Sequence, residues 1–286
     1  MWNPLAKPFR HDENETPYAK PEDFVADASR RPAAFISGGA SGIGKATAQR
    51  LLNMGWTVGS YDVNETIWGT DDIPEGQLIT GHLDVTDREN WDAALQDFTS
   101  KTGGRLDFLF NNAGIIIDGE VVDQDPEKVQ LLTDINCVGV VYGAQAAYPY
   151  LKATKDAVMI SMSSASAIFG QPEISTYSAS KFFVNGMTEA LSVEWRNDDI
   201  RVHDMMPLWA ATQVANVKAQ SVKNMGVNLT PGDIADETIK VLTSKQPWIK
   251  WVQHHSVSLS DRGLKWLRKP FPDPIAHVLM RFAAVW

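Results

Sequence analysis

The chain has a single cysteine, Cys137, so no disulfide can form within it, and such a composition is typical of a reducing compartment. It also lacks any run of about 18 apolar residues of the kind that a membrane-spanning helix requires. Residues 1–20 contain several acidic side chains and no apolar core, which argues against a secretory signal or an organelle transit peptide. We therefore expect a cytoplasmic protein with no stable membrane insertion.

Basic residues are outnumbered, because 26 Lys and Arg stand against 35 Asp and Glu and give a net charge of -9. Proteins that bind nucleic acid normally present a basic surface, so nucleic acid is not an expected partner. The apolar share of 44% over 286 residues is enough for a substantial core. With no internal repeat and no long linker, residues 33–260 are expected to form one domain between an N-terminal arm (1–32) and a C-terminal tail (261–286).

Short apolar runs alternate with helical patterns along this domain. Helices are predicted after the first run, over 87–101 and 134–153, around Tyr177, and from Pro231 onward. The alternation predicts an α/β fold, a single doubly wound Rossmann-type domain in which helices flank a central parallel sheet and a ligand binds at the carboxyl ends of the strands. The expected strands are 33–37, 57–61, 77–83, 106–110, 157–162, 200–206 and 248–259.

The first expected strand ends in the glycine-rich stretch SGGASGIG. Gly38, Gly42 and Gly44 allow a sharp turn that approaches a pyrophosphate, whose charge the N-terminus of the following helix favours. Glycines alone are weak evidence, because ordinary turns also use them. Asp62, however, ends the second expected strand 24 residues beyond Gly38, where this fold presents a carboxylate to the adenosine ribose.

Tyr177 and Lys181 lie four residues apart, so on a helix their side chains share one face. General-base work at neutral pH requires the pKa of a tyrosine to fall from about 10 toward about 7, or roughly 4 kcal/mol. A positive charge at about 4 Å contributes roughly that much at an effective dielectric of about 20, so Lys181 is expected to lower the pKa of Tyr177. Alone, such a pair is more often a helix tyrosine beside a solvated lysine, but the glycine turn and Asp62 favour a nicotinamide site.

The sequence also has the motif NNAG at 111–114, and Ser164 precedes Tyr177 by 13 residues. With these motifs it resembles the short-chain dehydrogenase/reductase family, in the branch with TGxxxGxG, NNAG and YxxxK, over about residues 33–260. Ser37 stands where the family usually has Thr, and Leu208 stands where glycine usually follows proline. The resemblance implies a homotetramer or homodimer acting on a secondary alcohol or its ketone, with a catalytic tetrad of Asn136, Ser164, Tyr177 and Lys181.

In that family's mechanism, Tyr177 would be the acid/base, and Lys181 would lower its pKa and hold the nicotinamide ribose. Ser164 would hydrogen-bond the substrate oxygen, and Asn136 would support a water path to Lys181. Hydride would pass between the substrate carbon and the cofactor. The residues expected to bind the cofactor are Gly38, Ser41, Gly42, Ile43, Gly44, Asp62, Asp84, Val85, Asn112, Ala113, Gly114, Tyr177, Lys181, Pro207, Ala210 and Thr212.

The expected cofactor is NAD, because the Asp62 carboxylate can accept hydrogen bonds from ribose hydroxyls and repels a 2′-phosphate. Lys45, at the start of the first helix, is the residue that could oppose this preference. Two alternatives stay open: an NADPH-dependent ketone reductase, and a non-catalytic dinucleotide-binding regulator, to which only Leu208 and the unusual termini point.

Other chemistries are less well supported. Neither Ser163 nor Ser164 lies in a G-x-S-x-G motif or near a His and Asp that would complete a hydrolytic triad. No metal site is expected, since the adjacent His254 and His255 would point to opposite faces of a strand.

The segment after Pro207 is expected to be a mobile lid in which Trp209 contacts substrate. The tail has five basic and two acidic residues, so it carries about +3 while the rest of the chain carries about -12. Its apolar side chains are too numerous to leave in water. Docking onto the acidic body or a neighbouring subunit is favoured over a membrane surface, because the prolines flanking Asp273 interrupt any long helix.

Overall fold

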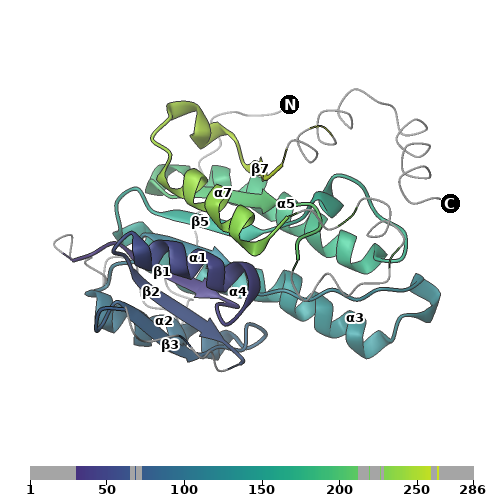
Figure 1. The fold of residues 1–286 in the computed structure, drawn as a ribbon, viewed down its shortest axis with the longest axis horizontal. Helices are drawn as coiled ribbons and strands as arrows, with labels where there is room; N and C mark the ends of the chain where they lie inside the picture. Colours follow the sequence, from purple (N-terminus) through teal and green to yellow (C-terminus); the bar gives the residue numbers. More distant parts are fainter. Residues whose placement is uncertain are drawn as a thin grey trace, which may run out of the picture.

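The computed structural model describes residues 30–64, 68, 73–211, 219, 226, 229–258 and 263. Within them, seven parallel strands form one sheet with the order β3-β2-β1-β4-β5-β6-β7 (Figure 1). This topology confirms the predicted doubly wound Rossmann-type fold. The strands are β1 (Ala33–Ser37), β2 (Thr57–Asp62), β3 (Leu78–His82), β4 (Phe108–Asn111), β5 (Val158–Met162), β6 (Arg201–Met206) and β7 (His254–Ser256).

Helices cover both faces of the sheet, and β1 shows why. Successive side chains of β1 alternate between two apolar clusters, with Phe35 in one and Ile36 in the other, and both are fully buried. Helices α1 (Gly42–Asn53) and α7 (Pro231–Thr243) contribute to the cluster that contains Ile36. The cluster on the other face receives side chains from α2 (Arg88–Thr102), α4 (Gly139–Ala153) and α5 (Ser175–Glu194).

The strand order reverses direction at β1, whose neighbours are β2 on one side and β4 on the other. The chain first builds outward from β1 to β3 and then returns to continue with β4. The helices that follow β1 and β4 therefore leave on opposite faces of the sheet. Such a reversal opens a crevice at the carboxyl ends of the strands, which is where this fold class holds its ligands.

The helix predicted over 134–153 begins earlier and changes its pitch. It starts with α3 (Pro126–Thr133), continues as the π-helical segment η3 (Asp134–Val138), and becomes α4. Asp125 caps α3 by accepting a hydrogen bond from the Glu127 N–H at 3.0 Å, and proline suits the first helical position. The prediction missed α3 because most of its residues are exposed and only Leu132 is buried, so no apolar face marks the helix.

The strand predicted over 248–259 was wrong in its extent. The 3₁₀-helix η7 (Pro247–Trp251) occupies its first part, and only β7 pairs with β6. Trp248 and Trp251 are exposed, and the Arg196 guanidinium lies 4.9 Å from the centroid of the Trp251 ring. A proline at the start of a turn favours helical geometry, which outweighed the strand preference of the tryptophans.

Helix α2 also begins differently from the prediction. Its N-cap is Asp87, whose carboxylate accepts from two backbone N–H groups of the first turn. The hydroxyl of the preceding residue, Thr86, does not cap the helix and donates to Asp84 at 2.7 Å. Across the described parts of the chain, none of the helices has the length and apolar character needed to cross a bilayer.

Candidate active site

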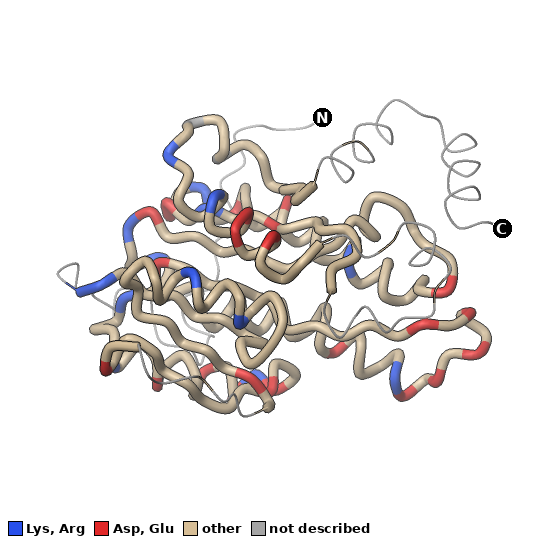
Figure 2. Tube along the Cα trace, in the orientation of Figure 1, with Lys and Arg blue, Asp and Glu red and all other residues tan. Residues whose placement is uncertain are grey.

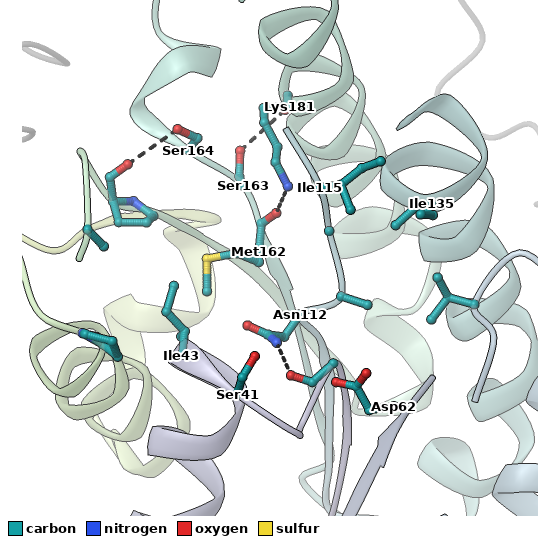
Figure 3. Close-up of a pocket in the computed structure, with 18 of the residues that line it drawn as sticks. Ser41, Ile43, Asp62, Asn112, Ile115, Ile135, Met162, Ser163, Ser164 and Lys181 are labelled. Carbon is teal, nitrogen blue, oxygen red and sulfur yellow. Dashed lines mark hydrogen bonds between the residues drawn. The ribbon is translucent and has the colours of Figure 1, made fainter. Parts of the chain in front are cut away.

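A cavity of about 650 Å³ lies at the carboxyl ends of strands β1 to β6 (Figure 3). Gly44 and Asn136 lie behind its wall rather than in its lining, and Thr212 is outside the described residues. The predicted site residues that line the cavity are Gly38, Ser41, Gly42, Ile43, Asp62, Asp84, Val85, Asn112, Ala113, Gly114, Ser164, Tyr177, Lys181, Pro207 and Ala210.

The glycine turn after β1 is packed too closely for larger residues. Gly38 has φ of +66°, and a Cβ there would lie 2.8 Å from the Cα of Ala113. A Cβ at Gly44 would lie 2.2 Å from the Gly38 carbonyl oxygen, so the turn folds against the start of α1. Ser41 occupies the N-cap of α1 without a side-chain capping bond, which leaves backbone N–H groups of the first turn beside the cavity.

Asn112 holds this turn against β4. Its Nδ2 donates to the carbonyl oxygens of Ser37 at 3.1 Å and Gly38 at 3.0 Å. The Ser37 hydroxyl accepts from the backbone N–H of Asn112 at 3.2 Å and of Ala113 at 3.3 Å. A serine in place of the usual threonine therefore still supplies the hydroxyl that joins the two loops.

Asp62 stands at the end of β2, at the edge of the cavity. One carboxylate oxygen accepts from the Ala40 N–H at 3.1 Å and the other from the Asn64 N–H at 3.0 Å. An ionised carboxylate offers about four acceptor positions, so Asp62 can accept further hydrogen bonds from hydroxyl groups. Lys45 is the residue whose positive charge could oppose the preference for NAD. Its Nζ lies 5.3 Å from the centroid of the Trp68 ring.

The loop after β3 closes the same end of the cavity. The Asp84 N–H donates to Asn90 at 2.6 Å, and the Val85 carbonyl accepts from the indole of Trp91 at 3.1 Å. These bonds fix the loop on α2, so Asp84 and Val85 present a defined wall beside Asp62.

The opposite end of the cavity holds the predicted reacting groups. Tyr177 is 8% exposed and Lys181 4%, and the Lys181 Nζ lies 5.5 Å from the centroid of the Tyr177 ring. The Lys181 ammonium donates to the Met162 carbonyl at 2.8 Å, as drawn in Figure 3. The Ser164 hydroxyl lies near enough to Tyr177 to lower the pKa of the phenol, and it accepts from the Ser166 N–H at 3.1 Å. A hydroxyl, a phenol and an ammonium thus share one buried corner.

The expected fall in the pKa of Tyr177 is contradicted by this geometry. Burial raises the pKa of Tyr177 to about 12, although the hydrogen bond from Ser164 acts in the opposite direction. Burial also lowers the pKa of Lys181 to about 8. The Lys181 ammonium donates to the Met162 carbonyl, and burial is the largest influence on the pKa of Tyr177. The phenol of the protein alone therefore keeps its proton at neutral pH.

Asn136 is fully buried in η3 and contacts the loop after β4. Its Oδ1 accepts from the Ile115 N–H at 2.9 Å, and its Nδ2 donates to the Ile115 carbonyl at 2.8 Å and to Ser180 at 3.1 Å. A Cβ placed on Gly114 would lie 3.2 Å from Asn136 Oδ1 and 3.6 Å from Lys181 Nζ. Asn136 therefore supports the backbone that faces Lys181 instead of reaching the cavity.

Several lining residues were not anticipated by the prediction. Ile115 directly follows the NNAG motif, and that adjacency could have identified it. Trp209 was expected only as part of a lid, yet it is 6% exposed and belongs to the same buried cluster as Tyr177. The further unanticipated lining residues include Val63, Asn64, Leu83, Ile135, Met162, Ser163, Leu208, Ala211 and Pro231.

His203, His254 and His255 lie apart from the cavity. His254 contacts Asp204 and Glu189 at 2.7 Å and 2.9 Å, while His255 approaches His203 at 3.3 Å. No group of three or more His, Cys, Asp and Glu side chains that could hold a metal ion occurs within the ranges the structure describes.

The cavity fits a dinucleotide. The turn at Gly38 and Gly44 is packed too closely for larger side chains, so its backbone can approach a bound diphosphate. The first turn of α1 has no side-chain cap, so its backbone N–H groups can donate to the diphosphate. Asp62, at the end of the strand next to β1, offers acceptors for ribose hydroxyls. Lys181 and Tyr177 line the opposite end of the cavity.

Comparisons with known proteins agree with this arrangement. The model of the short chain dehydrogenase family matches residues 32–223. A 3-oxoacyl-[acyl-carrier-protein] reductase from Thermotoga maritima is 30% identical over 202 residues, which cover 69% of this chain and 81% of the relative. A trans-4-hydroxycyclohexanecarboxylate dehydrogenase from Sinomonas cyclohexanicum is 33% identical, covering 64% of this chain and 74% of the relative.

Solved structures share the fold. The crystal structure of a 3-ketoacyl-(acyl-carrier-protein) reductase from Brucella melitensis, complexed with NADH, superposes with a TM-score of 0.68 at 24% identity, covering 79% of this chain and 96% of that one. An aldohexose dehydrogenase from Thermoplasma acidophilum gives a TM-score of 0.70 at 21% identity, with 86% and 98% covered. The family binds a nicotinamide dinucleotide, and its members here are dehydrogenases and reductases. The chain belongs to the short chain dehydrogenase family of oxidoreductases.

Proposed function

We propose that this protein interconverts a secondary alcohol and its ketone, that it prefers NAD, and that Tyr177 is its acid/base. The observation that carries the proposal is the position of Tyr177, Ser164 and Lys181 in the same cavity as Asp62. A dehydrogenase needs a proton-transfer group at one end of its cofactor site and a ribose anchor at the other. The same grouping counts against a regulator without turnover.

The nicotinamide would supply or accept the hydride, and the protein would manage the proton. In ketone reduction, the phenol of Tyr177 would donate its proton to the developing alkoxide, while Ser164 would donate a hydrogen bond to the same oxygen. A pKa of about 12 keeps this proton available at neutral pH. In alcohol oxidation the same phenol oxygen would take up the hydroxyl proton, which requires positive charge nearby to stabilise the phenolate. Lys181 would provide that charge.

The preference for NAD rests on Asp62. Its carboxylate faces the cavity beside the glycine turn, where a 2′-phosphate would meet negative charge. Lys45 lies over the Trp68 ring, a position that fits cation–π attraction. The proposed preference is at least about 10-fold, or about 1.4 kcal/mol.

The activities after which the relatives are named support the reaction class. They include an L-2,3-butanediol dehydrogenase at 32% identity and a tropinone reductase homolog at 31%. Since both dehydrogenases and reductases occur among them, an NADPH-dependent ketone reductase is the second candidate.

Two measurements test the proposal. Titration of the purified protein with NADH and NADPH should give the tighter dissociation constant for NADH, and Asp62→Asn should reduce the difference, because it removes the charge but keeps an acceptor for Ala40. Equal affinities in the unaltered protein would end the NAD assignment.

The second measurement follows cofactor absorbance during turnover of a ketone panel. Tyr177→Phe should lower kcat by about 100-fold to 10,000-fold while the NADH dissociation constant stays within about 2-fold. Tyr142→Phe, which removes another partly buried phenol hydroxyl, is the control and should retain activity. Near-normal kcat in Tyr177→Phe would remove Tyr177 as the acid/base.

A further inference from the structure

We propose that the cavity selects uncharged alcohols and ketones with an apolar body, and that it rejects substrates carrying a carboxylate or phosphate near the reacting carbon. This proposal rests on the function proposed above, because it takes the space beside Tyr177 as the place where the reacting carbon lies. Two independent features carry it: the chemistry of the wall beside Tyr177, and the charge of the surface next to that wall.

The wall beside Tyr177 is apolar. Ile115, Leu208 and Trp209 line the cavity there. Tyr177 and Trp209 belong to one buried cluster with Leu132, and Ile115 and its two successors in the loop after β4 pack against this cluster. Apart from the hydroxyls of Ser163 and Ser164 and the phenol itself, this end offers carbon surface, which favours an apolar substrate body by about 25 cal/mol for each Å² buried.

Charged groups are few in the lining and are already engaged. Among the described lining residues, the ionisable acids and bases besides Tyr177 are Asp62, Asp84 and Lys181. The two carboxylates stand after β2 and β3, at the end away from Tyr177. Lys181 is 4% exposed and donates to the Met162 carbonyl at 2.8 Å. A substrate carboxylate beside Tyr177 would therefore lose water without gaining a matched cation, which is costly.

The surface next to this wall is acidic. Residues 118–127, called here the acidic lobe, follow Ile115 along the chain and lead into α3. Figure 2 shows acidic positions along the loop and helix of this part of the fold. The exposed carboxylates of the lobe are Asp118, Glu120, Asp123, Asp125 and Glu127, and the next residue, Lys128, is basic.

Two hydrogen bonds fasten the acidic lobe to the first turn of α5, which carries Tyr177, and to the residues just before it. The Gly119 N–H donates to the Glu173 carbonyl at 2.8 Å, and the Thr176 hydroxyl donates to Gln124 at 2.9 Å. The lobe's negative charge is thereby held close to the reacting end of the cavity. Such a field lowers the local concentration of anions and slows their approach.

The first experiment compares the methyl ester of 4-oxocyclohexanecarboxylate with the free carboxylate, two ketones that differ mainly in one charge. With saturating NADH, we expect kcat/KM to be at least about 10-fold higher for the ester. Equal or better use of the carboxylate overturns the proposal while leaving the proposed reaction intact.

A binding measurement separates the proposal from the proposed mechanism, because it needs no turnover. Saturation-transfer NMR with NADH-loaded Tyr177→Phe should show the ester bound and the carboxylate bound at least about 10-fold more weakly. Stronger binding of the carboxylate, or no binding of the ester, contradicts the apolar selection even if kinetics supports Tyr177. If the ester binds but the unaltered enzyme reduces no ketone, the selection stands and the proposed reaction fails.

The second experiment tests the acidic lobe. In the double variant Glu120→Lys with Asp123→Lys, kcat/KM for the carboxylate should rise by about 3-fold to 10-fold, and the ester should change by less than about 2-fold. The gain should shrink at about 0.5 M salt, where charges are screened. The matched control is Glu75→Lys with Glu194→Lys, which makes the same charge change at exposed positions away from the carboxyl ends of the strands. An equal gain in the control, or none in the lobe variant, removes the lobe from the proposal.

Discussion

The side-chain amide of Asn136 pairs with both polar groups of the Ile115 backbone, accepting from its N–H at 2.9 Å and donating to its carbonyl at 2.8 Å. This pairing joins the π-helical segment η3 to the loop that follows β4, and it occurs in a side chain with no exposed surface. π-helical turns often occur at functional sites. Here the turn allows one asparagine to shape the loop that faces Lys181.

We predict that Asn136→Leu lowers both stability and turnover. The variant leaves two polar groups of the Ile115 backbone unpaired, which should lower the free energy of unfolding by at least about 2 kcal/mol. Because the loop beside Lys181 loses its support, kcat should fall more than the NADH affinity does. Denaturant unfolding and steady-state kinetics measure the two effects. The control is Asn53→Leu at the exposed end of α1, and an Asn136→Leu enzyme as stable and active as this control would refute the positioning role.

Lys181 should make stability depend on pH. Burial lowers its pKa from 10.5 to about 8, so between these values the unfolded chain binds a proton that the folded chain does not. The free energy of unfolding must then rise with pH across that window. Below pH about 8 it must be lower than above pH 10.5, because the folded protein then holds a buried charge. The rise amounts to about 3 kcal/mol.

Comparison with Lys181→Met isolates this contribution. The unfolding free energy of the unaltered protein, relative to that of the variant, should increase as pH is raised from about 8 to about 10. Lys128→Met, which removes an exposed lysine, is expected to alter stability by less than about 0.5 kcal/mol and serves as the surface control. A difference that stays constant or decreases with pH would contradict the assigned burial of the ammonium.

Gly44 should not tolerate a methyl group. In Gly44→Ala the Cβ would meet the Gly38 carbonyl at 2.2 Å and Asn112 Nδ2 at 2.6 Å, so the turn must move. We expect a loss of about 1–3 kcal/mol in stability and weaker NADH binding. Gly186→Ala is the matched control, because its added Cβ meets nothing within 4 Å outside the neighbouring backbone of its own helix and alanine favours helix. Normal cofactor affinity in Gly44→Ala would show that the turn does not need close packing.

The tail lies outside the described residues apart from Gly263, and its docking stays a prediction. Removing residues 261–286 should lower the melting temperature or change the oligomer size, because apolar side chains would lose the surface that covers them. Differential scanning calorimetry and light scattering measure these effects. The intact protein should not sediment with anionic liposomes. Strong liposome binding, together with unchanged stability and assembly after deletion, would favour the membrane interpretation.

Patterns in the sequence predicted an element correctly where a single property, such as burial on both faces, fixes its structure. The apolar runs at β1, β4 and β5 predicted strands, because a strand covered on both faces needs apolar residues at every position. The spacing of Ser164, Tyr177 and Lys181 predicted that they would meet. The structure places all three in one cavity.

Local patterns failed where a competing interaction outweighed them. The mostly exposed turns of α3 show little apolar period, although Asp125 and Pro126 give a recognisable helix start. The segment after residue 247 has strand-forming tryptophans, yet it begins with a helical turn. In both cases a capping or proline preference acted against the side-chain pattern.

The amino-acid sequence by itself determined the fold class and the family, and it predicted which groups would react, since these depend on periodicity and on fixed spacings along one chain. Only the tertiary structure decided the direction of the Tyr177 pKa, the pairing of Asn136 with Ile115, and the apolar wall that includes Trp209. Each of these depends on burial and on contacts between segments far apart in the sequence. Desolvation and hydrogen bonding act through the distances between such segments, which spacing along the chain does not contain.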